Sequence, residues 1–335
     1  MNKKEQRAKL VGQIEQVTEA KFKDSALAVF RYQAEFNPLY REFIKLLGVL
    51  PTEVQDIQQI PFLPISFFKY HTIQTGNWAA ACTFTSSGTT QQRFRSRHLV
   101  RSLNWYNQNA FRCFESHYGS IENYVVLALL PSYLEREGSS LVFMAERFIE
   151  ASKYAESGFF LHNQEALVAT LKACMAADKP VLLLGVTYAL LDLADAFPMP
   201  LKSTVLMETG GMKGTRKEMP KSAIHAHLKQ AFELDAIHSE YGMTELLSQA
   251  YSIGAGRFEP SPTLQVYIRE TTDPLTLLPD TKAGAVNIID LANIDTCSFI
   301  ATDDLGRRFS DGSFELLGRM DASDLRGCNL LVAEQ

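Results

Sequence analysis

The sequence predicts an α/β fold in which helices cover a parallel sheet, followed by a second region made mostly of strands. Between about residues 120 and 255, short apolar runs alternate with segments of helical periodicity. Runs without polar alternation are typical of strands in a parallel sheet that is covered on both faces. After about residue 260, strand-like segments follow one another with only turns between them, which is typical of antiparallel sheets.

Each expected element follows from a local pattern. Residues 5–47 have helical spacing, which Pro51, Pro61 and Pro64 then interrupt. Asn163 is suited to cap a helix. The expected strands of the middle region are 123–131, 179–186 and 203–211, and its expected helices are 163–177, 188–197 and 217–234. The expected strands of the last region are 264–270, 284–291, 297–304 and 313–320.

Composition narrows the class of protein. The chain has 335 residues, 46% of them apolar and 21% charged, with a net charge of −5, so we expect a globular chain of two or three domains and no nucleic-acid partner. The charged N-terminus and the short apolar runs favour a cytoplasmic protein without membrane insertion. Five scattered cysteines without a CxxC spacing indicate neither a disulfide framework nor a zinc site.

A run of hydroxyl side chains and a glycine follows an apolar lead-in. The segment reads CTFTSSGTT from Cys82 to Thr90, and two arginines, Arg93 and Arg95, come shortly after it. Hydroxyl groups, and backbone N–H groups near a glycine, can surround phosphate oxygens. The segment is not a P-loop, because no GxxxxGK[ST] occurs. A solvated surface turn is the alternative interpretation.

The block METGGMKG, from Met207 to Gly214, stands where an expected buried strand ends. Ligands of open α/β sheets bind outside the carboxyl ends of strands, and paired glycines would let a flat ring lie against the backbone. An ordinary strand-ending turn is the alternative, and the block taken alone favours it.

The block IHSEYGMTELL follows the last expected helix of the middle region. Tyr241, next to a glycine, could stack on a base. We expect a helix to begin at Thr244, where a phosphate could bind, and Glu245 could hold Mg²⁺ beside the phosphates. Alternatively, Thr244 is a simple N-cap and Glu245 a first-turn charge.

Two blocks lie near the end of the sequence. Asp303, in FIATDDLGR, is expected at the end of a buried strand, where a carboxylate could accept the hydroxyls of a ribose; an Asp-rich turn is the alternative. The last block, LLGRMDASDLRGCNLLV, contains two basic hinge dipeptides, Gly318-Arg319 and Arg326-Gly327.

In this order, the five blocks resemble the acyl-adenylate-forming superfamily, which includes acyl-CoA ligases, luciferases and peptide-synthetase adenylation domains. The segment GRMDASDLRGCNLL looks most like the phenylacetate-CoA ligase branch. The segments FTSSGTT, ETGGMKG, HSEYGMTELLSQAY and RGCNLL are most similar to the acyl-protein synthetases (LuxE-type, long-chain-fatty-acid–protein ligases) of the bacterial bioluminescence complex.

The resemblance implies the large domain of an adenylate-forming enzyme, with parallel sheets covered by helices and a barrel-like β region. The implied core is 1–316, with a helical part at about 1–50, an α/β part at about 80–255 and a β-rich part at about 260–316, and 317–335 is a short tail.

The resemblance also implies ATP and Mg²⁺ as cofactors and gives roles to matching residues. The residues implied to surround the ATP phosphates are Thr85, Ser86, Ser87, Gly88, Thr89 and Thr90. The remaining implied positions are Gly210 and Gly211 at the adenine, Tyr241 stacking near it, Gly242 as a further cofactor-binding residue, Thr244 at the α-phosphate, Glu245 on Mg²⁺, Asp303 on the ribose and Arg319 near the ribose and hinge.

The sequence departs from the superfamily in two places. It ends at Gln335, soon after Asp321, so we expect the full C-terminal domain and its catalytic lysine to be lacking. Lys213, with Arg93 and Arg216 as alternatives, is the candidate to replace that cation. The glycine and lysine that usually follow the hydroxyl-rich loop are also missing.

Cys328 is the expected acyl acceptor, because acyl-protein synthetases load a cysteine of their own near the C-terminus. Nearby arginines such as Arg326 and Arg319 could lower the pKa of its thiol. A buried cysteine in a last strand is the alternative.

The predicted function is therefore ATP-dependent activation of a carboxylic acid, with a fatty acid expected, as acyl-AMP. Transfer to Cys328 and then to a partner protein, such as a reductase or transferase, would follow. Three alternatives stay open: an acyl-CoA ligase-like enzyme that needs another chain, an acyltransferase that uses a preformed activated acyl group, and a non-catalytic nucleotide- or acyl-binding partner.

Three further sets of residues were weighed for a role in the site. His225 and His227 lie two apart on an expected helix, so they make a poor metal pair. Cys113 and His117, four residues apart, could form a catalytic dyad on a helix. Packing in the core is the favoured interpretation, because no third group is evident. His238 is a candidate to line the acyl or nucleotide site.

Overall fold

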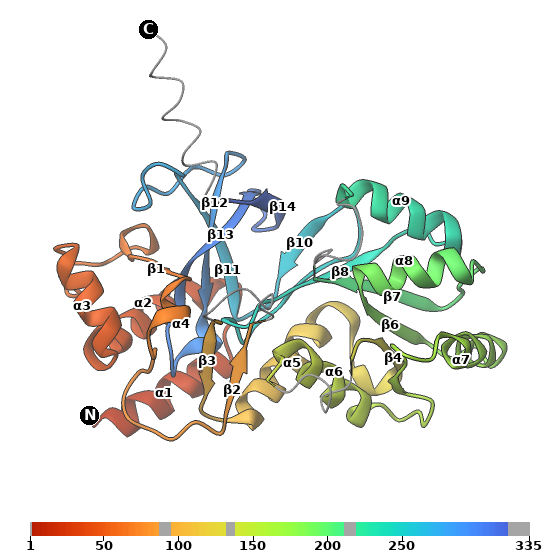
Figure 1. Ribbon diagram of the computed structural model, residues 1–335. Coiled ribbons are helices and arrows are strands. Elements are labelled where there is room, and N and C mark those ends of the chain that lie inside the picture. Colours follow the sequence, from red (N-terminus) through yellow and green to blue (C-terminus); the bar gives the residue numbers. More distant parts are fainter. Residues whose placement is uncertain (1, 87–94, 132–137, 211–218, 321–335) are drawn as a thin grey trace, which may run out of the picture. The chain divides into compact units, whose positions relative to one another are not determined.

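The computed structural model of the protein describes residues 2–86, 95–131, 138–210 and 219–320. The chain divides into two compact units, Met1–Asn77 with Leu264–Gln335, and Trp78–Thr263. Figure 1 shows the chain coloured along its sequence. Within the described ranges, every helix is too short or too polar to cross a bilayer.

The unit Trp78–Thr263 contains the alternating strands and helices. Its strands are β2 (Cys82–Thr85), β3 (Arg97–Val100), β4 (Val125–Leu129), β5 (Gly158–Phe159), β6 (Val181–Val186), β7 (Thr204–Thr209), β8 (His238–Tyr241), β9 (Ala250–Ser252) and β10 (Arg257–Pro260). Its helices are α5 (Leu103–Tyr118), η2 (Ile121–Asn123), α6 (Ser140–Ala151), α7 (Gln164–Ala176), α8 (Thr187–Ala196) and α9 (Lys221–Phe232).

The main sheet of this unit is parallel at its centre, as the sequence predicted. Its strand order is β10-β9-β8-β7-β6-β4-β5, with parallel pairing from β4 through β6 and β7 to β8. The fully buried β4 and the almost fully buried β6 explain why their sequences show no polar alternation. Because the central strands run in one direction, their carboxyl ends share one edge of the sheet.

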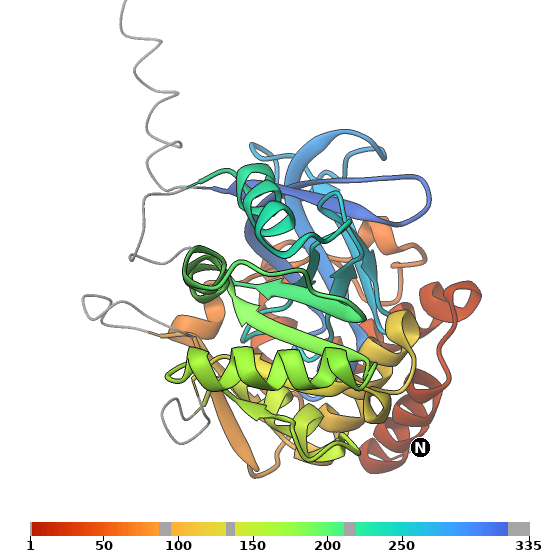
Figure 2. The same ribbon diagram turned by 90° about the vertical axis from the view of Figure 1, so that its right-hand side faces the viewer.

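Helices cover both faces of this sheet. One face packs residues of β4, β6 and β7 against α7, α8 and α9 in a single apolar cluster. On the other face, α6 packs against β4 and α5 against β9. Figure 1 shows α8 and α9 above strands β6 to β8, with α5 and α6 below, and in Figure 2 α9 (teal) again lies above the green strands.

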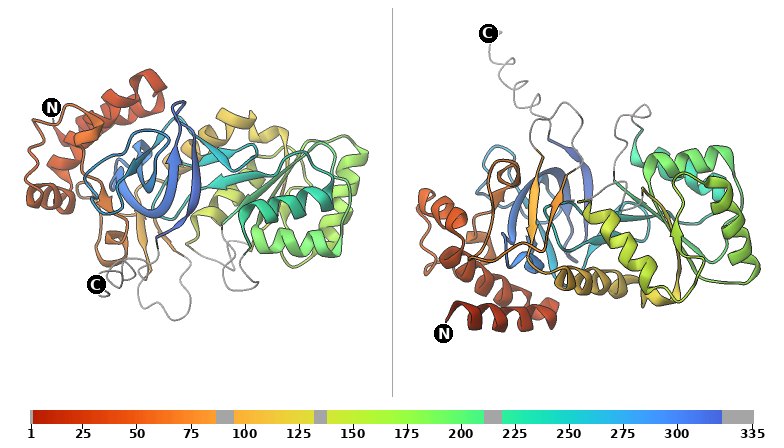
Figure 3. Two further views of the ribbon diagram at one scale, coloured as in Figure 1. Left: turned by 90° about the horizontal axis from the view of Figure 1, so that it is seen from above. Right: turned by 60° about the horizontal axis from the view of Figure 1, so that its bottom comes forward.

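The other unit joins N-terminal helices to an antiparallel meander. Its helices are α1 (Lys3–Glu15), α2 (Glu19–Phe36), α3 (Pro38–Leu46), η1 (Ile57–Gln59), α4 (Phe67–Tyr70) and η3 (Leu291–Asn293). Its strands are β1 (Leu63–Pro64), β11 (Leu264–Arg269), β12 (Ala283–Asp290), β13 (Phe299–Arg308) and β14 (Phe314–Arg319). Strands β11 to β14 pair antiparallel in chain order, and Figure 3 shows the red N-terminal helices beside the blue strands.

A buried glutamine connects the helices of this unit to its strands. The Gln33 amide donates to the carbonyls of Asn293 and Ile294, at 3.0 and 3.2 Å, and accepts from Ser298 N–H at 2.9 Å. These bonds satisfy backbone groups of the buried turn between β12 and β13, so α2 determines where β13 begins.

Most of the expected elements are confirmed. The helical region 5–47 forms three successive helices, and all seven expected strands are present with shifted ends. The three helices expected in the middle region are α7, α8 and α9. Asn163 caps α7 by accepting from Ala166 N–H at 2.9 Å.

The helix expected from Thr244 is wrong. Thr244 and Glu245 form a turn, closed by a bond from Leu246 N–H to Met243 O of 3.0 Å, and β9 follows. Side chains from other elements bind carbonyls that a helix would use for its own ladder: His98 binds Thr244 O, and Asn109 binds Leu247 O, both at 2.8 Å. Tertiary hydrogen bonds therefore override the local helical propensity.

The position expected for Asp303 is also wrong. Strand β13 runs on to Arg308, so Asp303 lies inside the strand and not at its end or in a turn. The reason is pairing with neighbouring strands, which continues past Asp303 on both sides. The turn-forming tendency of the local sequence therefore does not determine the conformation of the segment around Asp303.

Candidate functional site

Two motifs far apart in sequence are joined by one hydrogen bond in the unit Trp78–Thr263. Strand β2, which carries Thr85, pairs with β3, and His98 of β3 binds the carbonyl oxygen of Thr244 through Nδ1 at 2.8 Å. Because a carbonyl only accepts, Nδ1 carries the proton. Burial lowers the pKa of His98 to about 4, so the ring is neutral at pH 7 and holds the hydroxyl-rich hairpin beside the turn of Thr244 and Glu245.

The hairpin is further held at the point where the hydroxyl-rich loop begins. Thr85 N–H donates to Gly138 O at 2.8 Å, and Ser96 N–H donates to the Ser86 hydroxyl at 3.0 Å. Gly138 has a φ of +80°, and a Cβ there would lie 2.9 Å from the Thr85 hydroxyl. A glycine is therefore required for this close approach.

Gly210 and Tyr241 lie at the ends of adjacent parallel strands. Thr209 pairs with Glu240 across β7 and β8, so the residues that follow them, Gly210 and Tyr241, are neighbours at the carboxyl edge. The Tyr241 ring is 7% exposed and its centroid lies 5.8 Å from that of Phe258. The sequence placed both residues at one strand-end site, and their role toward adenine stays a prediction.

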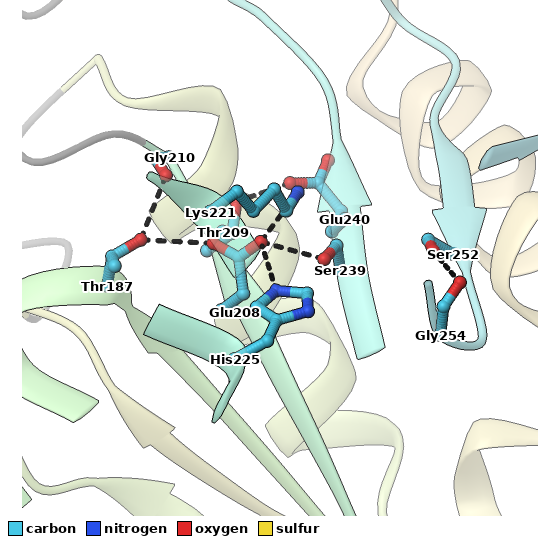
Figure 4. Close-up of polar contacts among 10 residues, drawn as sticks. All are labelled: Thr187, Glu208, Thr209, Gly210, Lys221, His225, Ser239, Glu240, Ser252 and Gly254. Carbon is cyan, nitrogen blue, oxygen red and sulfur yellow. Dashed lines mark hydrogen bonds and ion pairs between the residues drawn. The ribbon is translucent and has the colours of Figure 1, made fainter. Parts of the chain in front are cut away.

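A buried carboxylate beneath Gly210 was missed by the sequence analysis. Glu208, 5% exposed, accepts from the hydroxyls of Thr187 (3.0 Å) and Ser239 (2.7 Å) and pairs with Lys221 Nζ at 2.8 Å (Figure 4). Thr187 Oγ1 also lies 3.0 Å from Gly210 O. The cluster thereby fixes the backbone at Gly210, and the available signal was a glutamate at the end of an apolar strand.

The charge of Glu208 is stabilised by its neighbours. Burial alone would raise its pKa, but hydrogen bonds and charge from His225 and Lys221, with the Ser239 hydroxyl, lower it to about 2. His225 Nε2 lies 3.5 Å from Glu208 Oε1, whereas His227 pairs with Asp195 at 2.7 Å. The two histidines therefore point to different partners, as expected from their spacing.

Glu240 is a second buried carboxyl at this edge, also missed from the sequence. Its Oε2 accepts from the Thr209 hydroxyl at 2.5 Å, and its side chain is 9% exposed. Burial raises the pKa of Glu240 to about 7, and the nearby negative charge of Glu208 acts in the same direction. The two carboxyl groups therefore differ in charge below pH 7, with Glu208 ionised and Glu240 protonated.

In the other unit, Asp303 lies in a β-bulge. Ala285 pairs with Leu305 and Asn287 with Ala301, so three residues of β13 face one residue, Val286, of β12. A bulge interrupts the ladder and redirects the side chains of its extra residues. The structure thus gives Asp303 a special backbone setting that strand-end reasoning did not predict.

The guanidinium of Arg269 holds this bulge. It is 6% exposed and donates to Val286 O at 2.8 Å and to Thr302 O at 2.7 Å, and it also binds Asn287 Oδ1 at 2.8 Å. Burial lowers the pKa of Arg269 and the charge of Asp303 raises it. Arg269 is a site-supporting residue that was missed, because an arginine in a strand sequence has no distinctive pattern.

Arg319 lies close to Asp303 in this unit. Its Nε is 3.2 Å from Asp304 Oδ1, and Met320 N–H donates to Asp303 O at 2.7 Å. The Arg319 side chain is 65% exposed. The Arg319 side chain therefore contacts Asp304, the neighbour of Asp303, and the roles of Asp303 and Arg319 toward the ribose stay predictions.

The residues at the candidate site could bind Mg²⁺ only together with phosphate oxygens of a bound nucleotide. In the described ranges no group of three or more His, Cys, Asp or Glu side chains is placed to hold a metal. Glu245, 7% exposed, supplies one carboxylate at the turn beside the hairpin. Magnesium is commonly held by one or two carboxylates together with substrate phosphates, so Glu245 fits such a shared site.

Two weaker candidates have structural explanations. Cys113 is fully buried, and its sulfur lies 3.7 Å from Asn109 Nδ2, while His117 binds the Cys113 carbonyl rather than the thiol. His238 begins β8, where its Nδ1 lies 3.1 Å from Tyr118 OH. The suggestion that His238 lines the ligand site is not supported by this packing.

Several predicted site residues lie outside the described part of the chain. These are Ser87, Gly88, Thr89, Thr90, Gly211, Lys213 and Cys328, together with the alternatives Arg93 and Arg216.

Comparison with known proteins gives matches among solved structures. No family model matches the sequence, and no curated protein does. ATP-bound MatB from Rhodopseudomonas palustris matches with a TM-score of 0.54 at 15% identity, over 72% of this chain and 48% of that one. The chain therefore spans about half the length of that structure.

A second group of matches covers more of the chain. 2-Hydroxyisobutyryl-CoA ligase in complex with 2-HIB-AMP and CoA, in the thioesterification state, matches with a TM-score of 0.66 at 14% identity, over 93% of this chain and 71% of that one. An open conformation of the same ligase matches with a TM-score of 0.64 at 12% identity, over 93% and 78%.

These similarities define the class of fold. The chain has the α/β architecture of the large domain of adenylate-forming enzymes, so the predicted fold class is confirmed.

Replacing Glu240 by Gln should abolish the decrease in unfolding free energy that the wild type shows as the pH rises from 5 to 8. Its folded pKa of about 7 exceeds the ordinary 4.5, so its contribution is complete below pH 4.5 and is lost as the pH rises through 7. Relative to Glu240→Gln, the wild type should lose about 2.5 kcal/mol of unfolding free energy between pH 5 and pH 8. Urea denaturation at both pH values measures this. The exposed Glu259→Gln is the control, and parallel pH profiles for wild type and Glu240→Gln would contradict the assignment.

Replacing Arg269 by Lys should destabilise the protein, because an ammonium group cannot reach both carbonyls of the bulge at once. We expect a loss of about 2–4 kcal/mol in the free energy of unfolding, measured by urea denaturation. Arg307→Lys is the control, since its contact with Glu315 at 3.4 Å is a partly exposed ion pair and should matter by about 0.5 kcal/mol. Equal effects of the two changes would show that Arg269 does not hold the bulge.

Proposed function

We propose that the protein is an ATP-dependent ligase that activates a carboxylic acid as an acyl adenylate. One observation carries the proposal most: the His98–Thr244 hydrogen bond, which joins the hydroxyl-rich hairpin to the YGMTE turn, in a chain with the fold of adenylate-forming enzymes. The sequence resemblance favours a fatty acid as the substrate.

In the first step, a carboxylate oxygen of the acid attacks the α-phosphorus of ATP. The bond from that phosphorus to the bridging oxygen of the β-phosphate breaks, and pyrophosphate leaves with the electron pair. Thr85 and Ser86, with the loop that follows them, hold the phosphates, and Thr244 contacts the α-phosphate. Because Thr244 lies in a turn and not at a helix N-terminus, its hydroxyl and its own backbone, rather than a helix dipole, provide this contact.

Three other groups support this step. Gly210 and Tyr241 hold the adenine, and Asp303 accepts the ribose hydroxyls with Arg319 beside it. Magnesium held by Glu245 and the phosphates would offset charge that builds up on the phosphate oxygens. Lys213 is the proposed cation for this step.

In the second step, the thiolate of Cys328 attacks the acyl carbonyl and AMP leaves, which gives a thioester that passes the acyl group to a partner protein. A thiolate is an effective acyl acceptor. The sequence resemblance around RGCNLL supports this acceptor.

A second candidate acceptor is coenzyme A. The structurally similar 2-hydroxyisobutyryl-CoA ligase was solved with CoA and an acyl adenylate bound. An external thiol would take the place of Cys328 in the same chemical step, and the protein would then be an acyl-CoA ligase.

Exchange of radiolabelled pyrophosphate into ATP tests the first step. The protein should catalyse exchange only when a carboxylic acid is present, and Glu245→Gln should lower the rate about 100-fold by removing the carboxylate proposed to hold Mg²⁺ beside the phosphates. The exposed Glu165→Gln should leave the rate unchanged. Absence of exchange with every acid tested would contradict the proposed activity.

Labelling with tritiated fatty acid and ATP tests the acceptor. A hydroxylamine-sensitive label should form on the wild type and disappear in Cys328→Ser, while acid-dependent exchange persists. Cys82→Ser is the control, because burial raises the pKa of the Cys82 thiol to about 11 and makes it a poor nucleophile. Turnover that needs CoA, with no label on the protein, would instead identify CoA as the acceptor.

A further inference from the structure

Two buried polar side chains, Glu240 and Gln249, lie close together at the end of β8. Glu240 accepts through Oε2 from the Thr209 hydroxyl. Gln249 is 4% exposed, and its Oε1 has no hydrogen-bond partner among the described residues. Buried polar groups without partners are rare, because removing them from water costs free energy that nothing in the protein offsets.

Both side chains converge on Gly242. A Cβ built on Gly242 would lie 2.4 Å from Glu240 Oε1 and 3.6 Å from Gln249 Cγ. Any larger residue at this position would therefore displace the Glu240 carboxyl group. The backbone at Gly242 thus allows Glu240 and Gln249 to occupy one small region.

This region lies on the opposite face of the sheet from the Glu208 cluster. Side chains alternate along a strand, so Thr209 and Glu240 face away from the neighbouring pair, Glu208 and Ser239, whose partner Lys221 comes from α9 (Figure 4). By the same alternation, Gly210 and Tyr241, which are predicted to contact adenine, lie on the same face as Glu208 and Ser239. The Glu240 carboxyl group therefore belongs to the face of the sheet opposite Gly210 and Tyr241, on the side of Gly242.

The face that carries Glu240 has an apolar aromatic cluster. Tyr106 of α5 interacts electrostatically with Glu240, and its ring centroid lies 5.1 Å from Phe84 and 5.8 Å from Phe143. Apolar and aromatic walls with a few placed polar groups are typical of small-molecule sites.

We propose that Glu240, Gln249 and Thr209 form a polar subsite that binds a hydroxyl or amino group on the acyl part of the carboxylic acid substrate. This inference rests on the proposed acid-activating function. The donor group of the substrate would hydrogen-bond to Gln249 Oε1 and, when Glu240 is ionised, to Glu240 Oε1. A plain hydrocarbon chain would leave Gln249 Oε1 without a partner, so the site would discriminate against it.

Acid-dependent pyrophosphate exchange with matched acids tests the subsite. The probes are straight-chain acids from three to twelve carbons, each with its hydroxy and amino analogues. With wild type, at least one donor-bearing acid should have a kcat/KM about 100-fold above its plain analogue. Glu240→Leu and Gln249→Leu should each reduce that ratio at least about 10-fold, while the exposed Glu259→Gln should preserve both the ratio and exchange with plain acids.

Two outcomes overturn the inference and leave the proposed function intact. One is equal exchange with plain and donor-bearing acids in the wild type. The other is weaker ATP binding in Glu240→Gln with unchanged acid selectivity, which would identify the adenine amino group as the bound donor. Glu240→Gln preserves the size of the side chain, so it replaces Glu240→Leu in this experiment if Glu240→Leu fails to fold.

Absence of exchange with every acid would refute the proposed function. In that case, a measurement of acid binding by thermal denaturation tests the subsite by itself. A rise in Tm with a donor-bearing acid, absent with its plain analogue and lost in Glu240→Gln, supports the subsite. No such difference in Tm overturns it.

Discussion

The parallel pairing of β7 with β8 is the constraint on which the candidate site depends. Its register sets Glu208 opposite Ser239 and Thr209 opposite Glu240, and so brings the METGG and YGMTE segments to one edge of the sheet. Because neighbouring side chains on a strand point to opposite faces, the same register also separates two polar environments. One surrounds an ionised Glu208 beneath Gly210, and the other contains Glu240 beside an aromatic cluster.

The two glutamates show how environment decides charge. Both are buried, and burial raises the pKa of each. Glu208 has cationic neighbours on α9, which more than offset this effect, whereas the hydrogen bond from the Thr209 hydroxyl does not offset the burial of Glu240. The first carboxylate supports the backbone at Gly210, and a carboxyl group with a shifted pKa can take part in binding.

Asp303 illustrates how one predicted residue can depend on an unpredicted one. The sequence marked it as an acidic residue near a strand, but its setting is a bulge held by the buried guanidinium of Arg269. A planar group with several donors can satisfy two carbonyls at once, which a ladder interrupted by a bulge leaves without partners. The carboxylate that the resemblance assigns to the ribose is therefore supported from β11, far away in sequence.

The sequence by itself determined the order and type of most elements, because buried strands and capped helices such as α7 are encoded by local periodicity and by single residues such as Asn163. It also determined which motifs follow which strands. Only the tertiary structure decided that Thr244 lies in a turn, that Asp303 lies in a bulge, and that Glu208, Glu240 and Arg269 support the site. These features depend on hydrogen bonds and burial between residues remote in the chain, such as His98 with Thr244, and local patterns carry no information about such partners.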